Sequence, residues 1–127
     1  MCGIAGYHNK LISIDEIVNK TNQMSKTQSH RGPDDNGEFV DREQNFSMNM
    51  SRLSIIDPLG GKQPMSSYDG RYVIIFNGFI LNYVELKSKL LLKGVKFKSN
   101  NSDTEILLYS YIHYGKKILS KLNGAFS

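Results

Sequence analysis

The sequence predicts a layered α+β domain, because strand signals and helix signals alternate along the chain. Apolar and polar residues alternate from Phe46 to Arg52, which is typical of a half-buried strand. Ser-x-x-Glu sequences at 13–16 and 102–105 are capping boxes, in which the two side chains satisfy each other's free backbone N–H groups. We therefore expect one domain over residues 1–127, and its hydrophobic fraction of 39% is sufficient for a core.

In the first half of the chain we expect a strand, a helix, a loop and a second strand. The first strand covers residues 2–7, and the helix runs from the first capping box to about residue 29. Turn-forming residues indicate a loop from His30 to Gly37, and the second strand follows at 46–52. Inward-facing side chains on the helix should be Ile14, Ile17, Val18 and Met24. The strand should carry Phe46, Met48 and Met50 on its buried face and Ser47, Asn49 and Ser51 on the other.

The second half should alternate in the same way. A Gly-rich loop at 58–64 precedes a β-branched and aromatic run at 71–76, which predicts a buried strand ending at an Asn-Gly turn. A helix then opens near Asn82 and is closed by Gly94 at the C′ position. The second capping box starts a helix that Gly115 stops. Residues 122–127 look like the beginning of another strand, so we expect the chain to stop before the domain is complete.

The composition excludes several classes of protein. No apolar stretch reaches the roughly 18 residues that a membrane span needs, and the N-terminus lacks the pattern of a signal peptide. The single cysteine cannot form an internal disulfide, so a cytoplasmic protein is expected. The net charge is +4, but the densest lysine group, between Lys87 and Lys98, is typical of a solvated face and does not indicate a nucleic-acid patch. The three histidines have no metal-ligand spacing, and no metal site is expected.

Cys2 is the candidate nucleophile because it directly follows the initiator Met1. Removal of the methionine would place a thiol and a free α-amine on one residue. A free thiol ordinarily has a pKa of about 8.5 and a free α-amine of about 7.7–8.0, so such an amine can act as the base near neutral pH. The alternative is that Cys2 is a small apolar residue at the start of a strand.

A series of motifs in fixed order resembles the glutamine amidotransferases that begin with a cysteine. The chain starts Met-Cys-Gly-Ile-Ala-Gly and continues with His-Arg-Gly-Pro-Asp at 30–34 and Arg-Leu-Ser-Ile-Ile-Asp at 52–57. Gln-Pro-Met at 63–65, Asn77-Gly78 and Ser-Asp-Thr-Glu at 102–105 follow in the order of that family, and Leu-Asn-Gly at 122–124 closes the series. The motifs at 30–34, 52–57 and 63–65 together resemble those of the asparagine synthetase branch of the family. The matches span nearly the whole chain.

The resemblance implies a fold, a reaction and partners. The family fold is the four-layer αββα sandwich of N-terminal-nucleophile hydrolases, here incomplete at the C-terminus. The reaction is hydrolysis of glutamine to glutamate and ammonia, without a cofactor in this domain. The ammonia would feed ATP-dependent asparagine synthesis in a synthetase half that this chain lacks, and ATP and Mg are expected only there. That synthetase domain would act in cis or in trans, and the resemblance allows a homodimer.

The resemblance also implies a role for each matched residue. Cys2 would attack the amide carbon, while the side chain of Asn77 and the backbone N–H of Gly78 would stabilise the oxyanion. Arg52 would bind the substrate carboxylate and Asp103 its ammonium group. Further expected members are Ile55 and Ile56, through backbone groups in the pocket, and Arg31, which would brace the loop over the cysteine.

Each of these residues also has a simpler interpretation. Asn77-Gly78 is a common turn sequence, and Arg52 would suit a solvent-facing strand end. Asp103 stands in the first turn of a helix, where a carboxylate is favourable in any protein.

One departure from the family pattern concerns substrate binding. The family sequence NGEIYN reads NGFILN at 77–82, so Phe79 replaces a glutamate that would help to hold the substrate ammonium, and Leu81 replaces a tyrosine. Loss of one charge-assisted hydrogen bond costs about 1.5–3 kcal/mol. This departure favours a first alternative, an impaired remnant that binds a partner. Two further alternatives are an amidotransferase that feeds another acceptor and a general binding domain with a structural cysteine.

Overall fold

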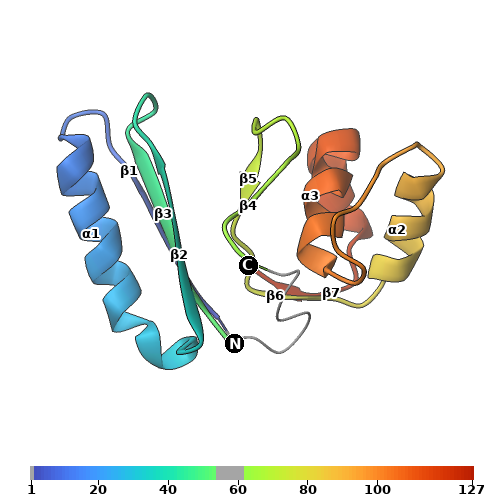
Figure 1. The fold of residues 1–127 in the computed structure, drawn as a ribbon, viewed down its shortest axis with the longest axis horizontal. Helices are drawn as coiled ribbons and strands as arrows, with labels where there is room; N and C mark the ends of the chain where they lie inside the picture. Colours follow the sequence, from blue (N-terminus) through green and yellow to red (C-terminus); the bar gives the residue numbers. More distant parts are fainter. Residues whose placement is uncertain (1, 54–61) are drawn as a thin grey trace. The chain divides into compact units, whose positions relative to one another are not determined.

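The computed structural model describes residues 2–53 and 62–127, which belong to two compact units, 1–54 and 55–127 (Figure 1). The elements of the first unit are β1 (Gly3–His8), α1 (Ile14–Thr27), the short 3-10 helix η1 (Ser29–Arg31), β2 (Asp35–Asp41) and β3 (Phe46–Arg52). Those of the second are β4 (Met65–Ser66), β5 (Val73–Ile74), β6 (Gly78–Ile80), α2 (Tyr83–Leu91), α3 (Asp103–Tyr114), the 3-10 helix η2 (Gly115–Lys121) and β7 (Gly124–Phe126). Both units combine helices with antiparallel strands, which confirms the α+β class. The loop expected at 58–64 lies largely outside the described residues.

The first unit is a three-stranded antiparallel sheet with α1 along one face (Figure 1). The strand order is β1-β3-β2, so β3 is central and pairs along its length with both neighbours. The predicted strands at 2–7 and 46–52 are confirmed to within one residue. The register places Gly3 beside Ser51, so the segment before β1 lies at the end of β3 that leads to Arg52.

The expected loop from His30 to Gly37 is wrong in its second half. Only the η1 turn and the residues up to Asp34 are irregular, because β2 begins at Asp35 and follows β3 in register from Arg52 to Phe46. Asn36 and Gly37, which read as turn formers, lie within that strand. Pairing with a central strand outweighs local turn preference here, as tertiary context commonly does in sheets.

The prediction that β3 is half-buried is also wrong, because its polar face is buried too. Ser47, Asn49 and Ser51 are each at most 6% exposed. Two of them meet polar side chains of α1: the amide of Asn49 donates to Asn22 Oδ1 at 2.6 Å, and the hydroxyls of Ser25 and Ser51 lie 3.2 Å apart. Ser47 Oγ and Asn49 Oδ1 are buried without a hydrogen-bond partner among the described residues, so the helix offsets only part of the cost of burying this face. The burial of Met48 and Met50 on the other face is as expected.

Helix α1 starts as predicted, with Ser13 Oγ accepting the N–H of Glu16 at 3.2 Å. The glutamate itself pairs with Lys20 (3.7 Å). Ile17 is fully buried as expected, but Met24 is 37% exposed and Thr21 is buried in its place. Thr21 can be buried because its hydroxyl donates to the carbonyl of Ile17 at 2.8 Å.

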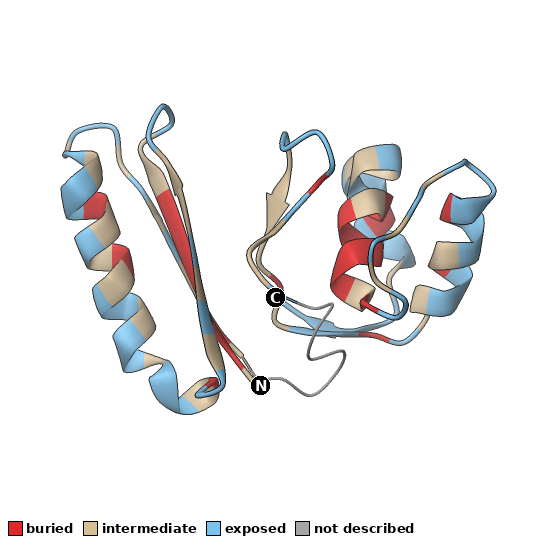
Figure 2. Cartoon of the chain, in the orientation of Figure 1, coloured by how far each residue is buried: buried red, intermediate tan, exposed pale blue. Residues whose placement is uncertain are grey.

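The second unit has its own core between the two helices and the strands before them. Figure 2 shows its buried positions concentrated on the inner side of α3. The sheet pairs are β4 with β5 and β6 with β7, both antiparallel. The strand expected at 71–76 is regular only at Val73–Ile74, and residues 122–127 contain β7 as predicted. The core consists of Phe76, Ile80, Leu86, Leu90, Ile106, Leu107 and Ile118.

Local signals set the helix ends in this unit. Gly94 adopts φ +80°, its N–H bonds to the carbonyl of Leu91, and the N–H of Val95 bonds to the carbonyl of Leu90 (2.9 and 3.1 Å). This bond pair is the Schellman arrangement expected of a glycine at C′. Helix α3 begins at the predicted cap, where Ser102 Oγ accepts the N–H of Glu105 at 3.3 Å. None of the helices within residues 2–53 and 62–127 is long and apolar enough to cross a membrane.

Candidate active site

Cys2 lies directly before β1, half-buried, beside the residue that follows β3. The backbone N–H of Leu53 donates to Cys2 Sγ at 3.4 Å, and the thiol in turn lies 3.8 Å from the carbonyl of Leu53. Cys2 Sγ thus lies within reach of a backbone donor and a backbone acceptor of the same residue. The surroundings of the thiol are therefore polar, unlike those of a small residue that only fills a core.

Two arginines stand at the same end of the sheet. Arg31 closes the η1 turn, and its Nε donates to the carbonyl of Cys2 at 3.3 Å. Arg52 ends β3 and is only 6% exposed, so its simpler interpretation as a solvent-facing residue is wrong. The carbonyl of Arg52 accepts the N–H of Asp34 at 3.0 Å, which ties the His-Arg-Gly-Pro-Asp segment to the strand. The first unit thus brings Cys2, Arg31 and Arg52 together.

Asn77 directly precedes β6 in the second unit, and Gly78 is the first residue of that strand. Asn77 exchanges two backbone hydrogen bonds with Ser127, at 3.0 and 2.8 Å, so the pair is a hydrogen-bonded one. In an antiparallel ladder such pairs alternate, and Gly78 faces Phe126 as a non-hydrogen-bonded residue. The N–H of Gly78 therefore points away from β7. The Asn-Gly pair is a strand start, so its simpler interpretation as an ordinary turn is wrong.

Gly78 is required at this position for a backbone reason. Its φ of +149° is rarely adopted by other residues, and a Cβ built there would lie 2.2 Å from the carbonyl oxygen of Ala125. The glycine thus allows β6 and β7 to approach closely while its N–H faces the other way.

Asp103 is the first residue of α3 and is half-buried. Its Oδ2 accepts the N–H of Ile80 at 3.1 Å, so the carboxylate connects the helix start to β6. Burial raises the pKa of Asp103 above its ordinary value, and hydrogen bonds from the backbone of Ile80 and Thr104 offset only part of this. A titratable group with a pKa shifted by burial is a candidate for a functional site.

Gln63 holds both the segment before β6 and the start of α3 in place. From the sequence, it was expected only as part of a family motif. Its Oε1 accepts the N–H of Phe76 at 2.6 Å, and its Nε2 lies 3.2 Å from the carbonyl of the same residue. The same Nε2 is 3.3 Å from Thr104 Oγ1. One side chain therefore fixes the residue before Asn77 and the residue after Asp103. The Gln-Pro-Met match at 63–65 was the available signal.

Phe79 is 45% exposed in the middle of β6. Side chains alternate along a strand, so Phe79 faces the opposite side from Ile80, which is in the core. Asn77, Gly78, Phe79 and Asp103 are thus gathered in the second unit, while Cys2, Arg31 and Arg52 belong to the first. The predicted binding residues Ile55 and Ile56 lie outside the described residues. Within the described part of the chain, no three His, Cys, Asp or Glu side chains are grouped to hold a metal ion.

Comparison with known proteins decides the family. The glutamine amidotransferase domain family matches residues 1–127. The chain belongs to this family. This confirms the membership that the motif series predicted, and it makes a free-standing binding domain with a structural cysteine an unnecessary interpretation.

Several relatives of this amidotransferase domain are glutamine-hydrolysing asparagine synthetases. The chain is 45% identical over 132 residues to asparagine synthetase 1 of Bacillus subtilis (strain 168), covering all of the chain and 20% of that protein. It is 38% identical over 128 residues to a probable asparagine synthetase of Schizosaccharomyces pombe and 34% identical over 131 residues to one of Zea mays. In both cases all of the chain is covered, against 22% and 21% of the relative. The chain therefore spans about a fifth of the length of these relatives.

Proposed function

We propose that this amidotransferase domain hydrolyses the side-chain amide of glutamine, with Cys2 as the nucleophile. The observation that carries the proposal is the setting of Cys2 in a chain of this family: an N–H directed at its sulfur at 3.4 Å and an arginine on its carbonyl at 3.3 Å. Loss of Met1 would free the α-amine of Cys2, which then takes the thiol proton. Such a mechanism needs no separate histidine.

The chemistry proceeds in two steps. The sulfur attacks the amide carbon, the C–N bond breaks, and the nitrogen leaves as ammonia with the proton that the α-amine holds. Water then hydrolyses the thioester to give glutamate and restore the thiol. Negative charge on the amide oxygen would be met by the side-chain NH2 of Asn77 and the N–H of Gly78, and the second of these is supported by its direction away from β7.

The ends of the substrate would be bound by groups of opposite charge. Arg52 would pair with the α-carboxylate through its planar guanidinium, and Asp103 would receive the α-ammonium. Burial, which raises the pKa of Asp103, also strengthens its attraction for a cation. Ile55 and Ile56 are proposed to add backbone contacts, and Arg31 to hold the loop at Cys2.

We further propose that the ammonia serves ATP-dependent asparagine synthesis in a separate domain, in cis or in trans. This proposal is supported by the relatives of the chain, which are glutamine-hydrolysing asparagine synthetases. The chain covers about a fifth of the length of each. The four-layer αββα sandwich and the single amidotransferase domain over 1–127 are proposed with it. They are supported by a helix-covered sheet in the first unit and by helices against strands in the second.

The test is glutamate release from glutamine by the protein purified from its native host. Cys2→Ala should abolish release while the far-UV circular dichroism spectrum stays that of the wild type. The matched control is Ser29→Ala, an exposed small polar residue in the same unit, which should leave release unchanged. Equal turnover by Cys2→Ala and wild type would show that the thiol is not the nucleophile.

A second candidate is a partner-binding remnant with little activity, and Phe79 is the observation that favours it. A phenylalanine at a position where the family carries glutamate cannot accept a hydrogen bond from the substrate ammonium. Wild-type protein that binds a synthetase domain but releases no glutamate, even at millimolar glutamine, would support this candidate over the enzyme.

A further inference from the structure

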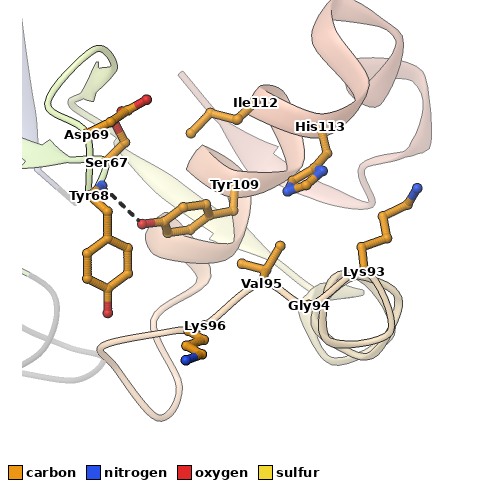
Figure 3. Close-up of a pocket in the computed structure, with 10 residues that line it drawn as sticks. All are labelled: Ser67, Tyr68, Asp69, Lys93, Gly94, Val95, Lys96, Tyr109, Ile112 and His113. Carbon is orange, nitrogen blue, oxygen red and sulfur yellow. Dashed lines mark hydrogen bonds between the residues drawn. The ribbon is translucent and has the colours of Figure 1, made fainter.

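A pocket in the second unit has no part in the glutamine chemistry. It lies between the turn after β4, the segment that follows α2, and the C-terminal half of α3 (Figure 3). Its volume is about 510 Å³, within the range of small-molecule sites. Every residue that lines it belongs to one compact unit, and none has been assigned to glutamine.

The floor of the pocket is apolar and held in place. It is made by Val95, Ile112 and the ring of Tyr109 (Figure 3). The hydroxyl of Tyr109 accepts the N–H of Tyr68 at 3.3 Å, and the ring meets Phe97 edge-on at 5.8 Å between centroids. Burial raises the pKa of Tyr109, so this hydroxyl stays neutral at physiological pH. A ring fixed at its hydroxyl and along its edge offers a preformed flat surface.

The rim carries an excess of positive charge. Two lysines, Lys93 and Lys96, line it beside one carboxylate, and the Lys93 ammonium already lies over the ring of Tyr114, at 5.4 Å from its centroid. The ammonium of Lys96 has no hydrogen-bond or ion-pair partner among residues 2–53 and 62–127. It is therefore available to a ligand.

The carboxylate on the rim does not cancel this charge. Asp69 accepts a hydrogen bond from the Ser67 hydroxyl at 2.6 Å and pairs with Arg71 Nε at 2.7 Å. The Ser67 hydroxyl, followed by the backbone and guanidinium of Arg71, lowers the pKa of Asp69. The charge of Asp69 is therefore matched by Arg71, which does not line the pocket, and it leaves the charges of Lys93 and Lys96 unpaired with it.

We propose that this pocket binds a small organic anion with a flat or branched apolar body and a carboxylate or phosphate head group. The body would rest on Tyr109, Val95 and Ile112, and the head group would pair with Lys96. Glutamine itself is a poor fit, because it has no apolar body and no net charge. The inference does not depend on glutamine hydrolysis.

Indole-3-acetate is a suitable probe, because the chain contains no tryptophan and the indole fluorescence then belongs to the ligand alone. Titration of the probe with the full chain should give a saturating rise in fluorescence anisotropy. Indole-3-acetamide, which keeps the ring and lacks the charge, should bind about 10-fold more weakly, the scale of one charge-assisted contact. Sodium phosphate carries a head group without an apolar body. If Lys96 binds the head group, phosphate should compete with indole-3-acetate and should not compete with indole-3-acetamide.

Two variants and one matched control decide the site. Lys96→Glu should weaken binding of the acetate about 10-fold, and Ile112→Ser should weaken acetate and acetamide alike. Lys89→Glu makes the same charge change on an exposed residue of α2 that does not line the pocket, and should alter affinity less than about 2-fold. The proposal is overturned if anisotropy does not saturate at millimolar protein, if the acetamide binds as tightly as the acetate, or if Lys96→Glu and Lys89→Glu have equal effects.

Discussion

Phe79 is the residue at which this amidotransferase domain departs from the family sequence beside the proposed ammonium-binding group. It stands on β6 between Gly78, whose N–H points away from β7, and Ile80, whose N–H donates to Asp103. Among the described residues, Asp103 is thus the one carboxylate proposed to receive the substrate ammonium. One of its oxygens already accepts a hydrogen bond from the backbone N–H of Ile80.

Phe79→Glu should therefore raise kcat/KM for glutamine by about 10- to 100-fold, because it restores one charge-assisted hydrogen bond. Phe79→Gln is the matched comparison, since it can restore a hydrogen bond without the charge. Steady-state glutamate release from the full-length protein should fall in the order Phe79→Glu, Phe79→Gln, wild type. A well-folded Phe79→Glu protein that is no better than wild type would show that this position does not contact the ammonium.

Asp103 gives a pH-dependent prediction. Because its pKa is raised in the folded state, folding favours the protonated form, and the ionised form at neutral pH is a net cost to stability. Asp103→Asn resembles the protonated form, so it should increase the free energy of unfolding at pH 7. The gain should shrink as the pH falls and vanish below 3.8, the ordinary pKa, where wild-type Asp103 is protonated both folded and unfolded.

Urea unfolding of wild type and Asp103→Asn across pH 3 to 7 measures this difference. Asp15→Asn is the control, because Asp15 is an exposed residue in the first turn of α1 and reports the helix-dipole contribution together with its exposed ion pair to Arg42 at 3.8 Å. A variant that is less stable than wild type at pH 7, by more than the control, would contradict the raised pKa. If Asp103→Asn is more stable but no longer turns over glutamine, Asp103 is kept for function at the expense of stability.

At the level of elements, Gln63 connects three segments that are far apart in the sequence. Its side-chain amide satisfies the N–H and the carbonyl of Phe76, a residue that is 4% exposed, and it contacts Thr104 at the start of α3. Without that side chain, the backbone N–H and carbonyl of the buried residue Phe76 would lose their hydrogen-bond partner.

Gln63→Ala should therefore lower the free energy of unfolding by about 1–3 kcal/mol. Gln23→Ala, the same substitution at an exposed position of α1, should change it by less than about 0.5 kcal/mol. Thermal or urea unfolding followed by circular dichroism checks both. Equal stability of Gln63→Ala and wild type would mean that water replaces the amide without cost.

The elements that the sequence predicted well are those with local signals. The caps at Ser13 and Ser102 and the closing bonds at Gly94 each depend on residues within a few positions of one another. Strand β2 was missed because its stability comes from antiparallel pairing with β3 and not from its own composition. Burial of the polar face of β3 was missed for the same reason, since it depends on polar side chains of α1.

On the scale of the whole molecule, ordered motifs predicted the family while distant contacts remained invisible. The motifs are spread from the first residues to 122–124, so their joint order was informative without any structure. Nothing in the sequence joins 67–69, 93–96 and 109–113, and only the fold brings them together around one pocket. The same holds for Gln63, whose partner Thr104 is 41 positions away.

The central claim is that Cys2, with its own α-amine as base, is the nucleophile of this amidotransferase domain. Intact-mass analysis and peptide mapping of the protein from its native host, after treatment with a glutamine-like alkylating agent, test it most directly. The account predicts a chain that lacks Met1 and carries one adduct, on Cys2, whose formation excess glutamine slows. Met1 retained in all molecules, or no adduct on Cys2, would contradict the claim.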